Sequence, residues 1–125
     1  MSEQKKGDLT IRVLAMPRDT NPSGDVFGGW LLSQMDIAGG VFCRKIAKGR
    51  VDTVAIDSTT FKLPVFVGDT LCCYVYLIKK GRTSLTVGIE AWVNREFGEE
   101  GSSIKVTEGQ YTYVKIDENR NSTPI

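Results

Sequence analysis

The sequence predicts an α+β domain in which about five mostly antiparallel strands wrap around one long central helix. A length of 125 residues, with 41% apolar and 25% charged residues, suits a single domain with its own hydrophobic core. One long stretch has helical periodicity. Five other stretches show the alternation or the apolar clustering of strands, and turn-forming residues separate them.

The helix is predicted from about Gly28 to Lys48, after a loop at 18–25 that is dense in turn-forming residues. Gly49 follows Lys45 and Lys48, which is typical of a helix C-terminus. The apolar residues expected to share one stripe of this helix are Leu31, Met35, Ala38, Phe42 and Ile46.

The predicted strands span residues 9–16, 51–61, 70–80, 83–95 and 103–117, and a loop at 97–102 precedes the last. The stretch 70–80 is apolar on both faces, so apolar side chains would also lie on the face away from the helix, together with Trp92. One helix covers only one face of a sheet, and further copies of the chain are expected to cover the other. Residues 1–8 and 118–125 are expected to be flexible tails.

Composition excludes several classes of protein. The formal net charge of +1 argues against nucleic-acid binding through bulk positive charge, and no apolar run reaches the roughly 18 residues of a membrane span. The polar N-terminus has no signal-peptide core, so a cytoplasmic protein is expected. Histidine is absent, which excludes histidine-based catalytic triads. Without histidine or a CxxC pair, Cys43, Cys72 and Cys73 are expected to be buried and structural rather than metal ligands.

The most informative motif is the stretch 24–30, GDVFGGW, which leads directly into the helix. Gly28 and Gly29 would leave backbone N–H donors open to a ligand at the positive end of the helix dipole. Such donors can stabilise a carbonyl oxygen that becomes an oxyanion. An ionised carboxylate nearby could activate water or attack the carbonyl itself. The motif therefore favours acyl transfer or hydrolysis.

The helix face that follows carries small residues and one carboxylate, namely Gly29, Ser33, Asp36 and Gly40. A glycine inside a helix costs roughly 1 kcal/mol relative to alanine. The pair Gly39 and Gly40 therefore indicates close approach by a ligand or another chain. Asp36 is either the catalytic carboxylate of a narrow channel or one residue of a solvated helix face.

Two further polar groups have both a functional and a structural interpretation. Asp25 is either a cap or turn residue, or a group that orients water at the carbonyl. The hairpin from Gly81 to Ser84 follows Lys79 and Lys80, and it combines arginine, hydroxyl groups and backbone N–H groups, which together bind phosphate. The structural interpretation of this cluster is a solvated charged turn.

The absence of histidine also narrows the substrate. An aspartate with an ordinary pKa of about 4 is a weak base at neutral pH. The leaving nitrogen of an amide must be protonated, whereas a thioester releases a thiolate whose parent thiol has a pKa of about 8.5. This chemistry favours a thioester over a peptide or an ester.

With these motifs, the chain resembles the hotdog-fold acyl-CoA thioesterases, and specifically the small bacterial YciA-type enzymes, from about Leu9 to Asp117. The most specific part of the match is the stretch from Gly24 to Asp36, which leads into the helix. The matching motifs are Ala15-Met16-Pro17, Asp19-Thr20-Asn21, Gly24-Asp25-Val26-Phe27-Gly28-Gly29-Trp30, Ser33-Gln34-Met35-Asp36, Gly49-Arg50-Val51, Val67-Gly68-Asp69 and Gly81-Arg82-Thr83-Ser84.

The resemblance implies an active site at the interface of a dimer with a continuous sheet, and dimers that often assemble as a trimer of dimers. It makes Asp36 the catalytic base or nucleophile, faced by Asp25 from the partner subunit. Gly28 and Gly29 would polarise the thioester carbonyl. The residues implied in binding the substrate or its coenzyme A moiety are Asn21, Ser33, Thr60, Gly81, Arg82, Thr83, Ser84 and Arg120.

The resemblance implies no metal and no cofactor other than the coenzyme A carried by substrate and product. Relatives commonly have asparagine in place of Thr60 beside the acyl channel, so their acyl-chain preference is not carried over. Two functions stay open: an acyl-CoA thioesterase, and a non-catalytic acyl-CoA-binding or sensing module on the same fold. The second would not need Asp36, so the presence of Asp36 with Asp25 favours the enzyme.

Overall fold

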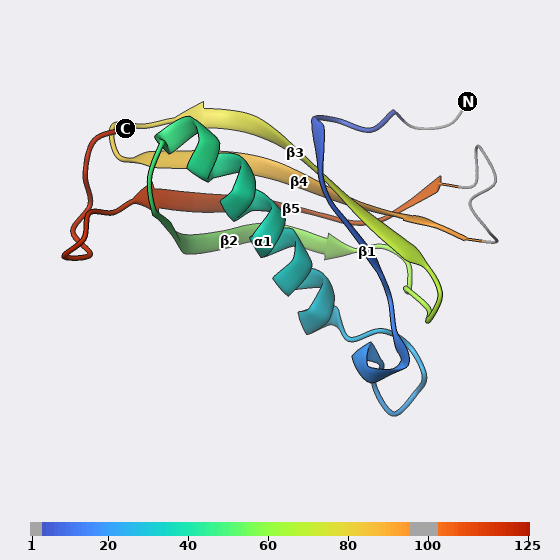
Figure 1. The fold of residues 1–125 in the computed structure, drawn as a ribbon. Helices are drawn as coiled ribbons and strands as arrows, with labels where there is room; N and C mark the ends of the chain where they lie inside the picture. Colours follow the sequence, from blue (N-terminus) through green and yellow to red (C-terminus); the bar gives the residue numbers. More distant parts are fainter. Residues whose placement is uncertain (1–3, 96–102) are drawn as a thin grey trace.

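A computed structural model describes residues 4–95 and 103–125 of the chain (Figure 1). The predicted loop at 97–102 lies outside the described residues. The one helix and five strands predicted from the sequence are confirmed, with bounds within two residues of those expected. A short 3-10 helix begins at Pro17, one residue before the predicted loop at 18–25. The elements are β1 (Asp8–Leu14), η1 (Pro17–Asp19), α1 (Gly28–Ala47), β2 (Val51–Phe61), β3 (Thr70–Lys80), β4 (Ser84–Asn94) and β5 (Ser103–Lys115).

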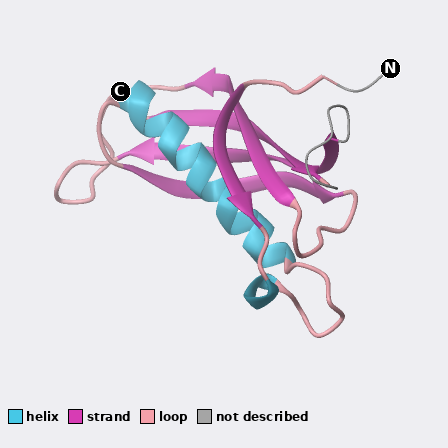
Figure 2. Cartoon of the chain, turned by 45° about the vertical axis from the view of Figure 1, so that its right-hand side comes forward, coloured by secondary structure: helices cyan, strands magenta, loops and turns pink. Residues whose placement is uncertain are grey.

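The strands form one antiparallel sheet in the order β1-β3-β4-β5-β2. The consecutive strands β3, β4 and β5 pair along their lengths and make its centre. β1 pairs with β3 and β2 pairs with β5, so β1 and β2 are the edge strands of the sheet. The sheet curves around α1, which lies along its concave face (Figures 1 and 2).

The core lies between α1 and the concave face of the sheet. The buried helix residues are Leu31, Met35, Ala38, Gly39, Cys43 and Ala47. Phe42 and Ile46, expected on the central stripe, are only half-buried and line a groove with Leu9 of β1. A one-residue step turns a helix by about 100°, so the buried row passes through Cys43 and Ala47 instead. No helix within the described ranges is long and apolar enough to cross a membrane.

The convex face of the sheet is partly covered by residues 4–7 of the same chain. The main-chain N–H of Lys6 donates to Oε1 of Glu90 at 3.1 Å, and Nζ of Lys5 lies 4.9 Å from the ring centre of Trp92. Cys72 and Trp92 are each only 3% exposed in a single chain. The expectation that Trp92 needs another copy as its cover is therefore wrong, because the N-terminal segment crosses this face.

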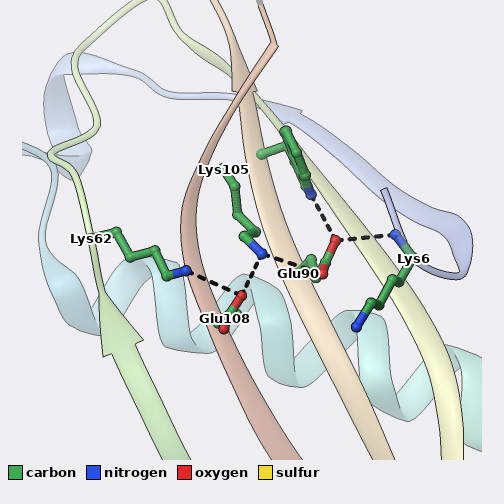
Figure 3. A network of polar contacts seen from close by, with 6 residues as sticks. Lys6, Lys62, Glu90, Lys105 and Glu108 are labelled. Carbon is green, nitrogen blue, oxygen red and sulfur yellow. Dashed lines mark hydrogen bonds and ion pairs between the residues drawn. The ribbon is translucent and has the colours of Figure 1, made fainter. Parts of the chain in front are cut away.

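An ion-pair network, buried at Glu90 and Lys105 and exposed at Lys62 and Glu108, lies beside that segment (Figure 3). Oε1 of Glu90 accepts a hydrogen bond from Nε1 of Trp92 at 3.0 Å. Nζ of Lys105 lies 3.6 Å from Oε2 of Glu90 and 2.6 Å from Oε2 of Glu108, and the Lys105 hydrogen bond lowers the pKa of Glu108. Lys62 pairs with the same Glu108 oxygen at 3.5 Å. The network joins β4 and β5 to the segment after β2.

Candidate active site

Asp36 lies in the middle of α1, half-buried, and faces β2 and β5. Its Oδ1 accepts a hydrogen bond of 2.6 Å from the Thr53 hydroxyl of β2 and one of 3.0 Å from the Tyr113 hydroxyl of β5. The Tyr113 hydroxyl also donates to the main-chain oxygen of Asp36 at 2.8 Å. Within the described part of the chain, no group donates to Oδ2. One carboxylate oxygen is therefore held and the other is open, which a freely solvated helix face would not provide.

Gly39 leaves the space that Tyr113 fills. A Cβ at position 39 would lie 2.7 Å from two ring carbons of Tyr113, too close without a shift of the ring. At Gly40 the nearest ring carbon would be 3.9 Å away, an ordinary contact. The expectation of a ligand or another chain at these glycines is corrected for Gly39. The group that comes close is a tyrosine of the same chain, because β5 packs across the helix there.

Both inward-facing tyrosines of β5 are hydrogen-bond donors to α1. Burial raises the pKa of Tyr113 far above its usual range, and the charge of Asp36 and the hydrogen bond to it raise it further. Burial and then Asp36 also raise the pKa of Tyr111, whose hydroxyl donates to the main-chain oxygen of Leu32 at 3.3 Å. Both phenols therefore stay protonated at neutral pH, and Tyr113 can act on Asp36 only as a donor.

Sequence reasoning missed Thr53 and Tyr113 as neighbours of Asp36. A signal was present, since Tyr111 and Tyr113 alternate on one side of a strand and a buried tyrosine hydroxyl needs a partner. A glycine inside the facing helix is a second signal, because it permits a ring to approach the backbone. The sequence did not reveal which helix residue would receive the hydroxyl, since that depends on how α1 lies across the sheet.

The N-terminus of α1 presents open backbone donors. Gly28 and Gly29 are its first two residues, and Phe27 precedes them with a side chain that cannot accept a hydrogen bond. N–H groups in the first turn have no partner within a helix. A Cβ at Gly29 would meet nothing within 4 Å, whereas one at Gly28 would lie 3.5 Å from the Phe61 ring. The tight glycine turn is at Gly24, with a φ of 91°, and not at the two helix glycines.

Asp25 lies in the loop that leads into α1, and Asn21 shapes this loop. Oδ1 of Asn21 accepts hydrogen bonds from the main-chain N–H groups of Ser23 at 2.9 Å and Asp25 at 3.2 Å. The cap interpretation of Asp25 is wrong, because Phe27 holds the N-cap position, and the turn interpretation fits. Asn21, Asp25 and Gly28 line an open groove of about 340 Å³. The structure thus brings three predicted site residues together.

The groove and Asp36 are separate places on one chain. Asp36 lies eight residues beyond Gly28 in α1, which is about 12 Å along the helix axis at 1.5 Å per residue. A catalytic carboxylate and the oxyanion donors must both lie about 3 Å from the same reacting group. In a single chain, Asp36 therefore does not share a carbonyl with Gly28 and Gly29.

Ser33 lies near Asp36, whereas Thr60 lies near the groove. Ser33 precedes Asp36 by one turn on the same helix face, and its hydroxyl donates to a main-chain oxygen three residues earlier at 2.7 Å. Thr60 is exposed on β2, after an irregular stretch where Ser58 has a left-handed φ of 54° and the pairing with β5 shifts. Thr60 directly precedes Phe61 and therefore lies nearer to the groove.

β2 is an open edge beside Asp36. Among the described strands, β5 pairs with one side of β2 and none pairs with the other. Val54 and Ile56 of β2 are 57% and 44% exposed, and Ile37 of α1 is 50% exposed. A long strand edge with apolar side chains is a surface that readily pairs with another chain.

The hairpin from Gly81 to Ser84 lies at the other end of the molecule, beyond the C-terminal end of α1 (Figures 1 and 2). The N–H of Gly81 donates to the main-chain oxygen of Ser84 at 2.8 Å and closes the turn. The main-chain oxygen of Thr83 accepts from Lys115 at 2.8 Å, and the Lys115 side chain lies beside Gly49. The structure therefore does not bring this hairpin to Asp25 within one chain.

Arg120 lies at the same end as the hairpin, in a turn of the C-terminal segment. Its N–H donates to the main-chain oxygen of Asp117 at 3.0 Å, and Oδ1 of Asp117 accepts from Asn121 at 2.9 Å. The N–H of Ile125 donates to the main-chain oxygen of Arg82 at 2.9 Å. The segment 118–125, for which the sequence predicts flexibility, folds back beside β5 and reaches the hairpin.

Burial makes Cys43 and Cys73 poor nucleophiles. Cys43, Cys72 and Cys73 are free and buried, as expected. Burial raises the pKa of Cys43 to about 12 and, with Cys72, that of Cys73 to about 12. Such thiols are not ionised at neutral pH. In the described part of the chain, no cluster of three or more acidic, cysteine or histidine side chains could hold a metal ion.

Comparison with known proteins identifies the family. Residues 23–96 match the sequence model of the thioesterase superfamily. The acyl-CoA thioester hydrolase YciA of Escherichia coli is 50% identical over 113 residues, which cover 90% of this chain and 86% of that protein. A hexameric thioesterase from Yersinia pestis is 46% identical with a TM-score of 0.90, over 98% of each chain. A hexameric hotdog fold thioesterase of Campylobacter jejuni is 40% identical with a TM-score of 0.88, over 95% of this chain and 90% of that one. The chain therefore belongs to the thioesterase superfamily, and within it to the hotdog-fold acyl-CoA thioesterases of the YciA type.

Proposed function

We propose that the protein hydrolyses acyl-CoA thioesters to a free carboxylic acid and coenzyme A, at a site shared by two copies of the chain. One observation carries the proposal: the half-buried Asp36 carboxylate has Oδ1 held by Thr53 and Tyr113 while Oδ2 is open. The family supports it, because the relative from Escherichia coli is named an acyl-CoA thioester hydrolase.

Asp36 supplies the reacting carboxylate. As a general base, it removes a proton from the water that attacks the thioester carbonyl carbon. As a nucleophile, it attacks that carbon itself, and water then hydrolyses the resulting mixed anhydride. In both routes the C–S bond breaks with its electron pair on sulfur, and the thiolate then takes a proton. With a thiol pKa of about 8.5, this leaving group needs no histidine acid.

The second copy supplies the donors for the developing oxyanion. Gly28 and Gly29 of the same chain lie too far along α1 from Asp36, whereas the open helix N-terminus of a neighbouring copy can approach it. Asp25 belongs to the groove at that N-terminus and would orient water or substrate there. Asn21 shapes the same loop and would act through its geometry.

The open edge of β2 is the proposed dimer contact. Pairing with β2 of a second copy would continue the sheet and cover exposed apolar side chains beside Asp36, such as Val54. The structures from Yersinia pestis and Campylobacter jejuni are described as hexameric thioesterases. We propose a hexamer for this chain as well, assembled as a trimer of dimers.

The hairpin from Gly81 to Ser84, with Arg120, is proposed to bind the phosphate-bearing end of coenzyme A. Exposed Arg82 and the hydroxyls of Thr83 and Ser84 suit phosphate oxygens. The hairpin lies at the far end of its own chain, so the assembly decides which copy's hairpin serves a given Asp36. Ser33 and Thr60 would border the path of the acyl group.

The test is thiol release from a panel of short-, medium- and long-chain acyl-CoAs, with Asp36→Asn measured beside the wild type. Because the substitution removes the only proposed base or nucleophile, we expect kcat to fall by about 10²- to 10⁴-fold. The amide has the size of the carboxylate, so the oligomer should elute unchanged in size-exclusion chromatography.

Near-normal turnover by Asp36→Asn would contradict the assignment of Asp36. A wild-type protein that binds coenzyme A tightly but cleaves none of the thioesters would instead be a binding module. The panel also measures the acyl-chain preference, which Thr60 and the groove leave open.

A further inference from the structure

Two buried tyrosines of β5 each donate a hydrogen bond to a main-chain oxygen of α1, but only one of them also donates to a side chain. Their rings stack with centroids 6.5 Å apart and an angle of 13° between the planes. Tyr111 donates to the main-chain oxygen of Leu32, and Tyr113 donates to the main-chain oxygen of Asp36. Only the Tyr113 hydroxyl also donates to a carboxylate oxygen, Oδ1 of Asp36 at 3.0 Å.

The Tyr113 hydroxyl therefore links the carboxylate of Asp36 to the main-chain oxygen of the same residue. One hydroxyl lies between the main-chain oxygen and Oδ1, so rotation of the side chain away from Tyr113 loses a hydrogen bond to an ionised group. Thr53 also donates to Oδ1, at 2.6 Å, but from the edge strand β2, whose surroundings would change on the proposed pairing with a second copy. Tyr113 is only 2% exposed, so water cannot readily take its place.

We infer that Tyr113 is the positioning residue of the site: its hydroxyl holds Oδ1 of Asp36 and thereby makes Oδ2 the oxygen that reacts. The inference rests on the proposed function of Asp36 and holds for both the base and the nucleophile route. Gly39 is part of the arrangement, since its missing Cβ admits the Tyr113 ring.

The experiment compares Tyr113→Phe with Tyr111→Phe, which also loses one buried hydroxyl that bonds to a helix carbonyl. For Tyr113→Phe we expect kcat to fall by about 10- to 100-fold, with KM for acyl-CoA within about twofold of the wild-type value. Tyr111→Phe should keep both the kcat and the KM of the wild type. A merely structural role would affect the two variants alike.

The inference is overturned if Tyr113→Phe keeps the wild-type kcat, or if Tyr111→Phe loses as much activity. Asp36→Asn distinguishes failure of this inference from failure of the proposed function. If Asp36→Asn stays active, the proposed role of Asp36 itself is wrong. If Tyr113→Phe does not fold, fluorotyrosine-labelled wild type and Asp36→Asn are compared by ¹⁹F NMR. The Tyr113 resonance should shift more than that of Tyr111, and equal shifts would overturn the inference.

Discussion

At the scale of single residues, Asp36 owes its fixed orientation to a glycine on its own helix. Because Gly39 has no Cβ, the Tyr113 ring can lie against the backbone of α1 and its hydroxyl can reach the carboxylate one turn earlier. The glycine costs roughly 1 kcal/mol of helix propensity. A hydrogen bond to a charged group contributes about 1.5–3 kcal/mol, which offsets that cost. Gly39 is thus explained by packing within the chain.

Alanine substitution at the two neighbouring glycines tests this explanation. Gly39→Ala would push a Cβ into the Tyr113 ring, and overpacking of this kind costs about 1–3 kcal/mol. Gly40→Ala has room for its Cβ, and better helix propensity should stabilise it by about 0.5–1 kcal/mol. Urea unfolding at one protein concentration measures both, and equal stability of the two variants would contradict the packing argument.

At the scale of elements, the segment 62–69 between β2 and β3 holds the loop that leads into α1. The main-chain oxygen of Val65 accepts from Val26 at 2.9 Å. Nε of Arg95 lies 3.1 and 3.0 Å from the two oxygens of buried Asp69, and its Nη2 donates to Pro64 at 2.7 Å. This pair at the ends of β3 and β4 therefore supports the groove that carries Asp25.

Removing the cation of that pair should destabilise the fold and the groove together. Arg95→Gln leaves the buried Asp69 carboxylate without its charged partner, and we expect a loss of about 1–3 kcal/mol with a higher KM for acyl-CoA. Thermal unfolding and steady-state kinetics measure the two effects.

The matched control for this element is Lys62→Gln. Lys62 pairs with Glu108 at 3.5 Å, and these side chains are 39% and 40% exposed (Figure 3). Exposed pairs contribute about 0–1 kcal/mol, so this variant should stay close to the wild type. If Lys62→Gln destabilises as much as Arg95→Gln, burial is not what gives the Asp69 pair its importance.

At the scale of the whole molecule, one chain holds the parts of the proposed site at separate places. Asp36 is in the middle of α1 beside the open edge of β2, Asp25 is before its N-terminus, and the hairpin from Gly81 lies beyond its C-terminal end (Figure 1). An assembly of copies can place these parts together, which a single chain does not.

Mixing of an Asp36 variant with an Asp25 variant tests the shared site. If each site takes Asp36 from one copy and Asp25 from the other, Asp36→Asn and Asp25→Ala should complement when co-refolded in equal amounts. Half of the random dimers are mixed and each has one intact site, so about a quarter of wild-type activity should return. Each variant refolded alone is the control, and activity no higher than the average of the two controls would contradict a shared site.

Much of the fold could be predicted because its signals are local. Turn-forming residues, the apolar stripe of α1 and the alternation of the strands act over a few residues, and they gave one helix and five strands. The prediction of the buried stripe of α1 was less accurate, because Phe42 and Ile46 are half-buried while Cys43 and Ala47 are buried. Which row of a helix is buried depends on how the curved sheet lies against it.

The sequence by itself determined the element order, the exclusion of histidine chemistry, and Asp36 and the helix glycines as candidates, because each follows from residue type and short spacing. The tertiary structure decided that Thr53 and Tyr113 hold Asp36, that Tyr113 fills the space at Gly39, and that residues 4–7 cover Trp92. Thr53 and Tyr113 are 17 and 77 residues away from Asp36 along the chain. Contacts at such separations depend on strand register and on how the helix crosses the sheet. Neither can be predicted from local sequence patterns.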